Sequence, residues 1–337
     1  MSSEIESGTV KKLMIYGATG YTGRMAAREA AAAGLAPVLA GRNTHTLSAL
    51  AAELGLEHRV FGLDEPVAVD DALSGVGVLL NCAGPYARTA EPLMTAAIRS
   101  GTHYLDVAAE LDSYLLAHKL EHEAVAAGVM LLPGSGGSVA MLGCLAAHAA
   151  RRVDGDVEHI AIALHVAGSM SRGSAVSAAE NLTVQCLHRV GGELVEQDPQ
   201  STRMFDFGEG PAACFPATLP DLVSLFESTN APNIDTYVHV SGDAFPDGDL
   251  ASLPDGPTDE EREANRYQAS VVATGTSGQV TRAVLDTVNG YTFTPTAAVE
   301  AARRVLAGEK RSGFQTPAGL FGYQFAETIA DTRIIDQ

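Results

Sequence analysis

Three glycines spaced three residues apart, just after a short apolar run, constrain the fold of this chain more than any other feature. Leu13–Tyr16 has the length and side-chain bulk of a buried strand, and Gly17, Gly20 and Gly23 follow it directly. An alanine-rich stretch with helical patterning then runs over Arg24–Ala33. A strand, a glycine turn and a helix in that order predict a βα unit that binds a dinucleotide.

The glycine spacing fits phosphate binding for local physical reasons. Gly17 permits a tight turn off the strand, Gly20 leaves the backbone open to a pyrophosphate, and Gly23 lets the helix lie close to the sheet. The N-terminus of the helix offers unpaired N–H groups and a partial positive charge to phosphates. A glycine turn that only packs a helix against a strand is the alternative interpretation. The residues predicted to bind the cofactor here are Gly17, Thr19, Gly20, Tyr21, Thr22 and Gly23.

The composition narrows the class of protein. The chain has 337 residues, of which 46% are hydrophobic, which is enough for a sizeable core and for two domains. Its formal net charge of −19 argues against nucleic acid and anionic membrane surfaces as partners. The cysteines form no CxxC pair, Met1–Val10 is not a signal peptide, and no apolar run approaches the roughly 20 residues of a membrane helix. We therefore expect a cytoplasmic protein with reduced thiols.

Strands and helices alternate over residues 1–152, which predicts an α/β fold with a Rossmann-type, doubly wound parallel sheet. The clearest buried strands are Val76–Leu80, His103–Val107 and Val129–Leu132. A long helix is expected over Glu110–Ala127. Thr44 is the expected cap of the helix after the second strand.

The pattern changes in residues 153–290, for which we expect a second, α+β domain built on a mostly antiparallel sheet. In Glu158–Val166 large apolar residues alternate with His and Ala, which is typical of a strand in an antiparallel sheet covered on one side. A helix over Ser174–Val190 and a loop-rich region over Gly191–Asn233 are expected between such strands. This domain is predicted to carry substrate and subunit contacts, which allows a homodimer. Residues 291–337 are expected to pack back on the first domain.

The acidic segment Asp243–Glu263 is expected to leave the compact part of the second domain. It is rich in proline, glycine and acidic residues. Thr258 and Glu261 have the spacing of a capping box, which predicts a short acidic helix. The negative charge of this segment is interpreted as a solvent-exposed surface rather than as a functional site.

Arg42 bears on which dinucleotide binds. It stands at the end of the predicted second strand, where NAD-binding proteins commonly place Asp or Glu against the ribose hydroxyls. A guanidinium at this position pairs with a 2′-phosphate that a carboxylate would repel. Gly41 and Asn43 are included in this predicted cofactor contact, and a surface arginine lying over the sheet edge is the alternative. The sequence therefore favours NADP over NAD.

The turn Asn81–Tyr86 follows the fourth strand and is predicted to lie near the nicotinamide. Ala83 and Gly84 are small enough for a ring to pass close to the backbone. Tyr86 is a candidate catalytic residue and a candidate substrate contact, and a packed tyrosine is the alternative. The predicted cofactor contacts in this turn are Asn81, Ala83, Gly84 and Pro85.

Other polar residues stand at the ends of predicted elements. Asp106 is the second catalytic candidate, although it and Glu110 would also suit the positive end of the following helix. Ser135, in the glycine-rich turn after the sixth strand, and Arg172, at the start of a helix in the second domain, are predicted to bind substrate. A pair of histidines four residues apart lacks a third ligand, so no metal site is predicted.

Seven short motifs occur along the chain. They are GATGYTGR at Gly17–Arg24, NCAGPY at Asn81–Tyr86, THYLDVAAE at Thr102–Glu110, SRGSAVS at Ser171–Ser177, DFGEGP at Asp206–Pro211, PNIDTYV at Pro232–Val238 and GFQTPA at Gly313–Ala318. In this order, over about residues 10–335, they resemble the saccharopine dehydrogenase-like oxidoreductases, and among these the trans-acting enoyl reductases most. The chain departs from the family pattern at Ala109, where glycine is usual, and at Gly136–Ala140, where a Gly-Phe-Asp-Ser-Val-Pro-like run is usual.

The resemblance implies an NADP-binding Rossmann domain joined to an α+β domain, and the reduction of a C=C or C=N bond. We therefore expect an NADPH-dependent oxidoreductase that transfers a hydride to the activated C=C bond of a small-molecule or thioester-linked enoyl substrate. Two alternatives stay open. One is a saccharopine-type amino-acid or imine dehydrogenase, in which Arg172 would bind the substrate carboxylate. The other is a non-catalytic NADP-binding regulator.

Overall fold

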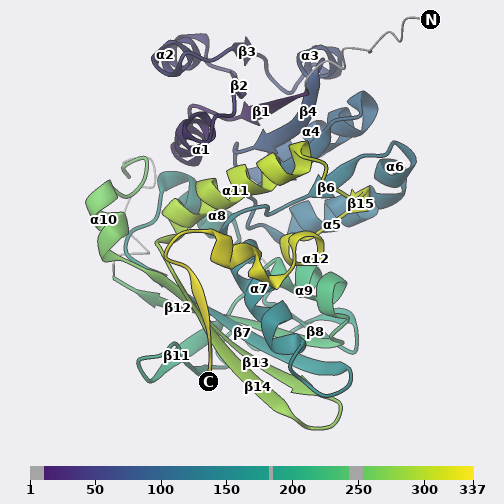
Figure 1. The fold of residues 1–337 in the computed structure, drawn as a ribbon. Coiled ribbons are helices and arrows are strands. Elements are labelled where there is room, and N and C mark those ends of the chain that lie inside the picture. The colour runs from purple at the N-terminus through teal and green to yellow at the C-terminus, as the bar shows by residue number, and fades with distance from the viewer. Residues whose placement is uncertain (1–10, 182–184, 243–252) are drawn as a thin grey trace, which may run out of the picture.

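Two sheets lie one above the other, with helices between them and around the upper sheet (Figure 1). This arrangement is seen in a computed structural model that describes residues 11–181, 185–242 and 253–337. The expectations for Met1–Val10 and for residues 243–252 of the acidic segment lie outside the described residues.

In the part of the chain that the structure describes, the first sheet contains seven parallel strands in the order β15-β6-β5-β4-β1-β2-β3. Its first six strands along the chain follow the doubly wound pattern, in which the strand order reverses between β1 and β4. The predicted α/β class with a parallel Rossmann-type sheet is therefore confirmed. The strands are β1 Lys12–Tyr16, β2 Val38–Gly41, β3 His58–Val60, β4 Val76–Asn81, β5 His103–Asp106, β6 Met130–Leu132 and β15 Gly313–Phe314.

Helices cover both faces of this sheet because its strands are apolar on both sides. Ile15 and Leu39 face α1, α2 and α11 in one buried cluster. Met14 and Leu79 face α3, α4, α5 and α6 in another. These helices are α1 Tyr21–Ala32, α2 Thr44–Leu54, α3 Pro66–Ala72, α4 Tyr86–Ser100, α5 Leu111–Lys119, α6 Glu121–Ala126 and α11 Gly290–Leu306.

Two details of these helices correct the sequence-based expectation. Asn43, not Thr44, caps α2, because its side chain accepts a hydrogen bond from the N–H of Thr46 at 3.1 Å. The long helix expected over Glu110–Ala127 is divided into α5 and α6 at Leu120, whose ψ of 2° leaves the helical range. Both helices still bury an apolar face in the same cluster.

The second sheet is mixed and mostly antiparallel, as predicted. Its strands follow the order β10-β11-β12-β7-β13-β14-β16, while β8 pairs with β12 and with β9. Among the strand pairs described for this second sheet, β12 and β7 alone are parallel. Their register runs from Asn233 opposite His159 to Ser241 opposite Ala167. The strands are β7 Val157–Ala167, β8 Leu187–Val190, β9 Glu193–Glu196, β10 Arg203–Asp206, β11 Pro211–Pro216, β12 Asn233–Ser241, β13 Tyr267–Gly275, β14 Val280–Thr287 and β16 Arg333–Asp336. The remaining helices are α7 Gly137–Ala150, α8 Arg172–Asn181, α9 Asp221–Thr229, α10 Asp259–Ala264, α12 Pro317–Phe321 and the 3-10 helix η2 Tyr323–Thr328.

Strand β7 is buried on both faces, whereas one covered face was expected. Ile160 and Ile162 join the core that α7 and α9 form between the two sheets. On the other face, Ala161 and Ala163 belong to a separate apolar cluster with Phe205 of β10. Because alanine is small and only weakly hydrophobic, the alternation of residues in β7 does not reveal that the β10–β11 hairpin closes over it.

The segment between β7 and β12 differs most from the expectation. The helix predicted over Ser174–Val190 is α8, which ends at Asn181, and strand β8 occupies the last residues of that range. The region expected to be loops over Gly191–Asn233 contains β9, β10, β11 and α9. These strands are short and partly exposed, so they lack the long apolar alternation from which strands are predicted.

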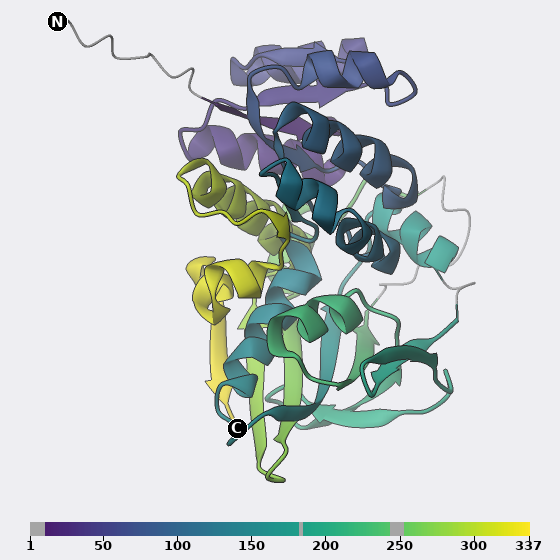
Figure 2. The same ribbon diagram turned by 90° about the vertical axis from the view of Figure 1, so that its right-hand side faces the viewer.

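The C-terminal segment, residues 291–337, contacts both sheets (Figure 2). Helix α11 lies against α1, and β15 extends the first sheet beside β6. Helix η2 lies against α7, and β16 then pairs antiparallel with β14 at the edge of the second sheet. The segment therefore joins the two sheets, and the predicted domain boundaries stay a prediction.

Candidate functional site

The turn after β1 brings the backbones of three loops together. The N–H groups of Gly17 and Ala18 both donate to the carbonyl of Ala40 at the end of β2, at 2.9 and 3.2 Å. Gly17 has a φ of +78°, and a Cβ at this position would lie 2.8 Å from the Cβ of Ala83 in the loop after β4. A residue with a side chain therefore does not fit at position 17 unless the loop after β4 moves.

Gly23 is required by a second close approach. A Cβ at Gly23 would lie 2.1 Å from the carbonyl oxygen of Gly17, so helix α1 starts directly on the turn. The N–H of Gly20 donates to the same oxygen at 3.0 Å, and Gly20 itself is exposed. Close contacts thus require glycine at positions 17 and 23, and a Cβ at the exposed Gly20 would lie 3.3 Å from the carbonyl oxygen of Gly17.

Helix α1 presents an uncapped N-terminus at this turn. Its N-cap is Gly20, in extended conformation, and no side chain of the described residues caps the helix. The N–H groups of Tyr21 and Thr22 in the first turn lie at the positive end of the helix dipole. An exposed helix start of this kind is a binding site for phosphate groups.

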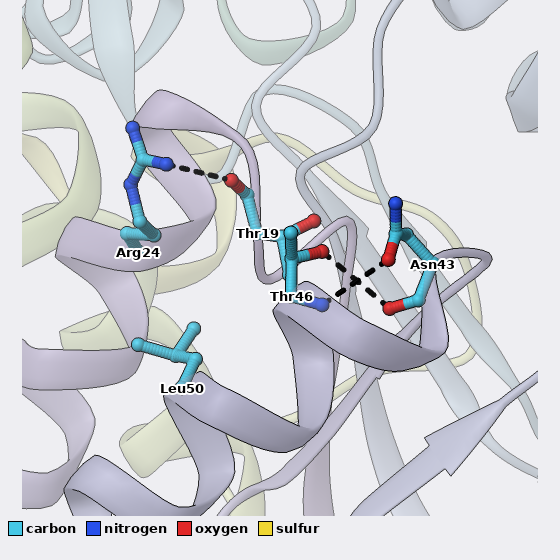
Figure 3. Close-up of a pocket in the computed structure, with 5 residues that line it drawn as sticks. All are labelled: Thr19, Arg24, Asn43, Thr46 and Leu50. Atoms are coloured by element: carbon cyan, nitrogen blue, oxygen red, sulfur yellow. Dashed lines mark hydrogen bonds between the residues drawn. The ribbon is translucent and has the colours of Figure 1, made fainter.

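A cavity of about 270 Å³ lies between the starts of α1 and α2 (Figure 3). It is lined by Thr19, Arg24, Asn43, Thr46 and Leu50. Arg24 Nη1 donates to the carbonyl of Thr19 at 3.1 Å, and the side chain of Asn43 is held by the N–H of Thr46 (Figure 3). One wall carries a guanidinium and another is the start of α2, so the cavity favours an anionic group.

Three of these lining residues, Arg24, Thr46 and Leu50, are absent from the site residues predicted from the sequence. Arg24 follows Gly23 directly, and this position within the glycine motif is the signal by which it was open to prediction. Arg42, the predicted partner of a 2′-phosphate, is exposed at the end of β2 and does not line the cavity. Burial raises the pKa of Tyr16, and the guanidinium of Arg42 lies near enough to oppose this rise.

Asn81 holds the loop after β4 and is fully buried. Its Oδ1 accepts the N–H of Ala83 at 3.0 Å, and its Nδ2 donates to Thr89 Oγ1 at 3.1 Å. Thr89 in turn donates to the carbonyl of Ala83 at 2.6 Å. The loop continues through an exposed glycine and a cis Gly84–Pro85 peptide bond. The side chain of Asn81 therefore shapes this loop from within.

A buried hydrogen-bond network joins the ends of β4, β5 and β6. Asn81 Nδ2 also donates to the hydroxyl of Tyr104 at 3.1 Å, and that hydroxyl donates to Asp106 Oδ2 at 2.9 Å. Asp106 Oδ1 accepts the N–H groups of Ala108 at 3.0 Å and of Gly134 at 2.7 Å. Burial raises the pKa of Asp106 to about 6, although the two N–H donors oppose the rise. Both carboxylate oxygens of Asp106 are thus bonded within the protein.

The polar side chains predicted to act near the nicotinamide are all buried. The hydroxyl of Tyr86 is directed at the carbonyl of Asn81, 3.4 Å away, and burial raises the pKa of Tyr86 well above its usual value. The N–H and the hydroxyl of Ser135 both donate to the carbonyl of Asp106, each at 2.8 Å. The structure therefore gives Tyr86, Asp106 and Ser135 partners inside the protein, where they fix the loops at the carboxyl edge of the sheet.

Polar contacts between described residues join the second domain to this edge and to the glycine turn. Glu110 Oε1 accepts a hydrogen bond from Ser177 of α8 at 2.7 Å. Arg172, at the start of α8, pairs with Asp255, which also accepts a hydrogen bond from Arg24 at 2.9 Å. Arg172 consequently lies beside the glycine turn, and its guanidinium is engaged by a carboxylate of the same chain.

Membrane-spanning helices and groups of metal ligands are both absent from the described ranges. In residues 11–181, 185–242 and 253–337, every helix is too short or too polar to cross a bilayer. In the same ranges, no three His, Cys, Asp or Glu side chains are grouped as the ligands of a metal ion would be.

Part of the first domain matches the model of a known domain family. Residues 13–132 match the model of the saccharopine dehydrogenase NADP binding domain. A saccharopine dehydrogenase-like oxidoreductase of Rattus norvegicus is 27% identical over 147 residues, which cover 37% of this chain and 34% of that protein. A trans-acting enoyl reductase of Mycobacterium tuberculosis strain H37Rv is 31% identical over 106 residues, which cover 29% of this chain and 25% of that protein. The resemblance inferred from the motifs is confirmed by these matches.

Solved structures match the fold of nearly the whole chain. Apo saccharopine dehydrogenase (L-Glu forming) from Saccharomyces cerevisiae covers 97% of this chain and 100% of its own, with a TM-score of 0.66 and 13% identity. The homospermidine synthase of Legionella pneumophila, in complex with NAD, covers 97% of this chain and 91% of its own, with a TM-score of 0.65 and 11% identity. At these identities the likeness concerns the fold alone.

The match to the family model is limited to the first domain. This chain aligns with 34% of the rat relative and with 25% of the mycobacterial one. The matched region contains the glycine turn and the cavity residues, and it ends at Leu132, before the second domain. Residues 13–132 are thus a nicotinamide dinucleotide-binding domain.

Proposed function

We propose, on the premise that residues 13–132 belong to the saccharopine dehydrogenase NADP-binding domain family, that this chain is an NADPH-dependent oxidoreductase. The observation that carries the proposal is the cavity beside the glycine turn, at which the starts of α1 and α2 meet. The pyrophosphate would rest on the first turn of α1, at Tyr21 and Thr22, and the 2′-phosphate would lie between Arg24 and the start of α2. When bound, NADPH supplies the hydride.

The charge around the cavity supports NADPH over NADH. Sites for NAD commonly hold the ribose hydroxyls with a carboxylate at the end of the second strand. Here that position is Arg42, and the five described residues that line the cavity include no carboxylate. A guanidinium and a helix start favour a phosphate dianion over a pair of neutral hydroxyls.

The acceptor that we propose is an activated C=C bond, such as that of an enoyl group in a small-molecule or thioester-linked substrate. The similarity of 106 residues of this chain to a trans-acting enoyl reductase supports this choice. The alternative, a dehydrogenase that acts on an amino acid or imine, needs a cation for the substrate carboxylate. Arg172 was the candidate for that role, and its guanidinium is paired with Asp255. The choice of the enoyl acceptor therefore rests on this similarity.

The contribution proposed for this chain's own residues is positioning rather than acid–base chemistry. Tyr86 and Asp106 are bonded within the protein, and Asn81 shapes the loop on which the nicotinamide would lie. A fixed loop holds the cofactor and the acceptor in reacting geometry, which is a large source of rate enhancement. The proton that completes the reduction is proposed to come from water, because the Tyr86 hydroxyl is directed at a backbone carbonyl.

Consumption of NADPH with two classes of acceptor tests the proposal. The purified full chain is mixed with NADPH and either an enoyl thioester or a keto acid together with an amine. Oxidation of NADPH with the enoyl thioester alone is the expected result. Oxidation with the keto acid and amine alone would replace the proposal by the dehydrogenase alternative. Binding of NADPH without oxidation by either acceptor would favour the non-catalytic regulator.

A further inference from the structure

A segment of the second domain, residues 253–262, lies across the start of α1, and we call it the strap. Gly256 lies so close to the ring of Tyr21 that a Cβ at position 256 would be 2.7 Å from three ring atoms. The hydroxyl of Tyr21 donates to the carbonyl of Pro257 and accepts a hydrogen bond from Arg262 Nη1 at 2.7 Å. The strap thus contacts the helix start at which a phosphate would bind.

The strap has its own local order. Thr258 and Glu261 form the predicted capping box at the start of α10, with hydrogen bonds of 2.6 and 3.3 Å, so that prediction is confirmed. Arg262 Nε donates to Thr292 Oγ1 of α11 at 3.2 Å. These contacts fix the position of the strap relative to α1 and α11, and with it the position of Asp255.

Asp255 places one carboxylate between two guanidinium groups. Its Oδ2 accepts a hydrogen bond from Arg24 Nη2 at 2.9 Å, and its Oδ1 accepts one from Arg172 Nη2. The backbone N–H of Arg172 also donates to the carbonyl of Asp255, at 3.3 Å. Asp255 is therefore attached to α8 at two points and to α1 at one point.

Arg24 is the residue for which two anions would compete. Its guanidinium lines the cavity proposed for the 2′-phosphate and at the same time holds Asp255. The Arg24–Asp255 pair is partly exposed, with 36% and 55% of the two side chains accessible, and exposed ion pairs are weak. A phosphate dianion carries more charge than a carboxylate, and it can accept two hydrogen bonds from the guanidinium to which Asp255 offers one acceptor, so it displaces the carboxylate.

We propose that Asp255 competes with the 2′-phosphate of the cofactor for Arg24 and thereby sets the selectivity between NADPH and NADH. The inference rests on the proposed function, because it concerns the cofactor which that function requires. When the phosphorylated cofactor binds, Arg24 turns to its phosphate, and Asp255 stays with Arg172 on the second domain. NADPH binding therefore releases one attachment of the strap to α1, whereas NADH binding leaves it in place.

Calorimetric titration of the full chain with NADPH and with NADH tests this competition. Asp255→Asn removes the charge and keeps the size of the side chain. We expect the affinity for NADPH to rise about twofold to fivefold, the range that an exposed ion pair supports, and the affinity for NADH to change less. The matched control is Glu53→Gln on α2. It breaks the 3.0 Å ion pair of Glu53 with Arg28, which lies on α1 as Arg24 does. It should leave the ratio of the two affinities unchanged.

A double variant separates competition from a general charge effect. Arg24→Gln alone should reduce the preference for NADPH, and adding Asp255→Asn should then have no further effect on the ratio of the two affinities. The inference is overturned if Asp255→Asn alone leaves the ratio unchanged or lowers it, or if its effect persists without Arg24. Failure of the unmodified chain to bind either dinucleotide would instead overturn the proposed function, so the two failures are distinguishable.

Discussion

The two ends of the proposed cofactor site differ in how their polar groups are used. At the glycine turn, the uncapped start of α1 and the guanidinium of Arg24 border a cavity of about 270 Å³. At the ends of β4, β5 and β6, Asn81, Tyr104 and Asp106 are buried and hydrogen-bond to one another and to the loops. We call the first end the open end, because the start of α1 is uncapped and the ion pair of Arg24 is partly exposed. We call the second the closed end, because its polar groups are buried and hold the backbone.

The difference teaches how polar residues at the carboxyl edge of a parallel sheet are to be interpreted. Their position makes each of them a candidate for chemistry, but buried polar groups need hydrogen-bond partners and commonly find them in the protein. Asp106 is such a case, because its Oδ2 accepts a hydrogen bond from Tyr104 and its Oδ1 accepts hydrogen bonds from two backbone N–H groups. Asp106 is fully buried with its partners, whereas Arg24 keeps 36% of its side chain exposed, so burial together with partners separates a supporting residue from one that can bind a ligand.

We expect the largest effect from a substitution in the glycine turn, at the open end of the site. In Gly23→Ala the new Cβ would meet the carbonyl oxygen of Gly17 at 2.1 Å, so the turn and the helix would be forced apart. We expect the free energy of unfolding to fall by about 1–3 kcal/mol and the NADPH affinity to fall on the order of 100-fold, as for a binding group misplaced by about an ångström. Thermal denaturation and calorimetry measure the two. Gly62→Ala, whose Cβ would meet only Asp64 Oδ2 at 3.9 Å, is the control. Unchanged NADPH affinity in Gly23→Ala would contradict the role of the turn.

A buried carboxyl near the closed end should make stability depend on pH. Both carboxylate oxygens of Asp221, at the start of α9, and the hydroxyl of Ser224 are buried without a hydrogen-bond partner among the described residues. Asp221 lies near enough to Tyr114 for its charge to raise the pKa of that phenol, and the Tyr114 hydroxyl donates to the carbonyl of Ala108 at 2.8 Å. Burial raises the pKa of Asp221 from 3.8 to about 8.

The sign of the effect follows from the two protonation states. Between about pH 4 and about pH 8 folded Asp221 keeps a proton that the unfolded chain has released, so stability falls as pH rises through this window, by up to about 1.4 kcal/mol per pH unit. Asp221→Asn should lose this contribution. Urea unfolding at about pH 5 and about pH 8 measures it, and Asp259→Asn, which changes a side chain that is 87% exposed, is the control. A difference between Asp221→Asn and the original chain that does not vary with pH would contradict the assignment.

Breaking the network at the closed end should have a smaller effect, mainly on stability. Tyr104→Phe removes the hydroxyl between Asn81 and Asp106 and leaves both side chains one partner short. The free energy of unfolding should fall by about 1–3 kcal/mol, the usual penalty for an unsatisfied buried group, while NADPH affinity changes less. Urea unfolding and calorimetry measure both, with Tyr16→Phe as the matched variant. Lost NADPH binding at unchanged stability would show that Tyr104 faces the cofactor instead.

We expect the smallest effect from a substitution of Arg42, which tests which arginine at the open end contacts the 2′-phosphate. Arg42 is exposed and lies outside the cavity lining, so its charge acts on a bound phosphate through solvent. Arg42→Gln should reduce the preference for NADPH over NADH by roughly threefold, the scale of an exposed charge pair. Calorimetric titration with both dinucleotides measures this. A much larger loss would make Arg42, rather than Arg24, the direct partner of the 2′-phosphate.

The features that the sequence predicted are those set by neighbouring residues. The glycine turn, the succession of strands and helices along the first domain, and the capping box of Thr258 and Glu261 each depend on short stretches of chain. The features that it missed depend on contacts between distant stretches. Arg24 lines the cavity only because α1 packs beside α2, and Asp255 reaches Arg24 across 231 positions of the chain. The hairpin over Ala161 is likewise a tertiary contact that residue alternation does not encode.

The central claim is that the two helix starts beside the glycine turn bind a dinucleotide that carries a 2′-phosphate. Isothermal titration of the purified chain with NADPH, and separately with NADH, tests this claim most directly. The geometry predicts saturable binding of both, with NADPH bound more tightly. Equal affinities would contradict the role given to the cavity and Arg24. The absence of binding heat with either dinucleotide, in a chain that unfolds cooperatively, would contradict the assignment of the site as a whole.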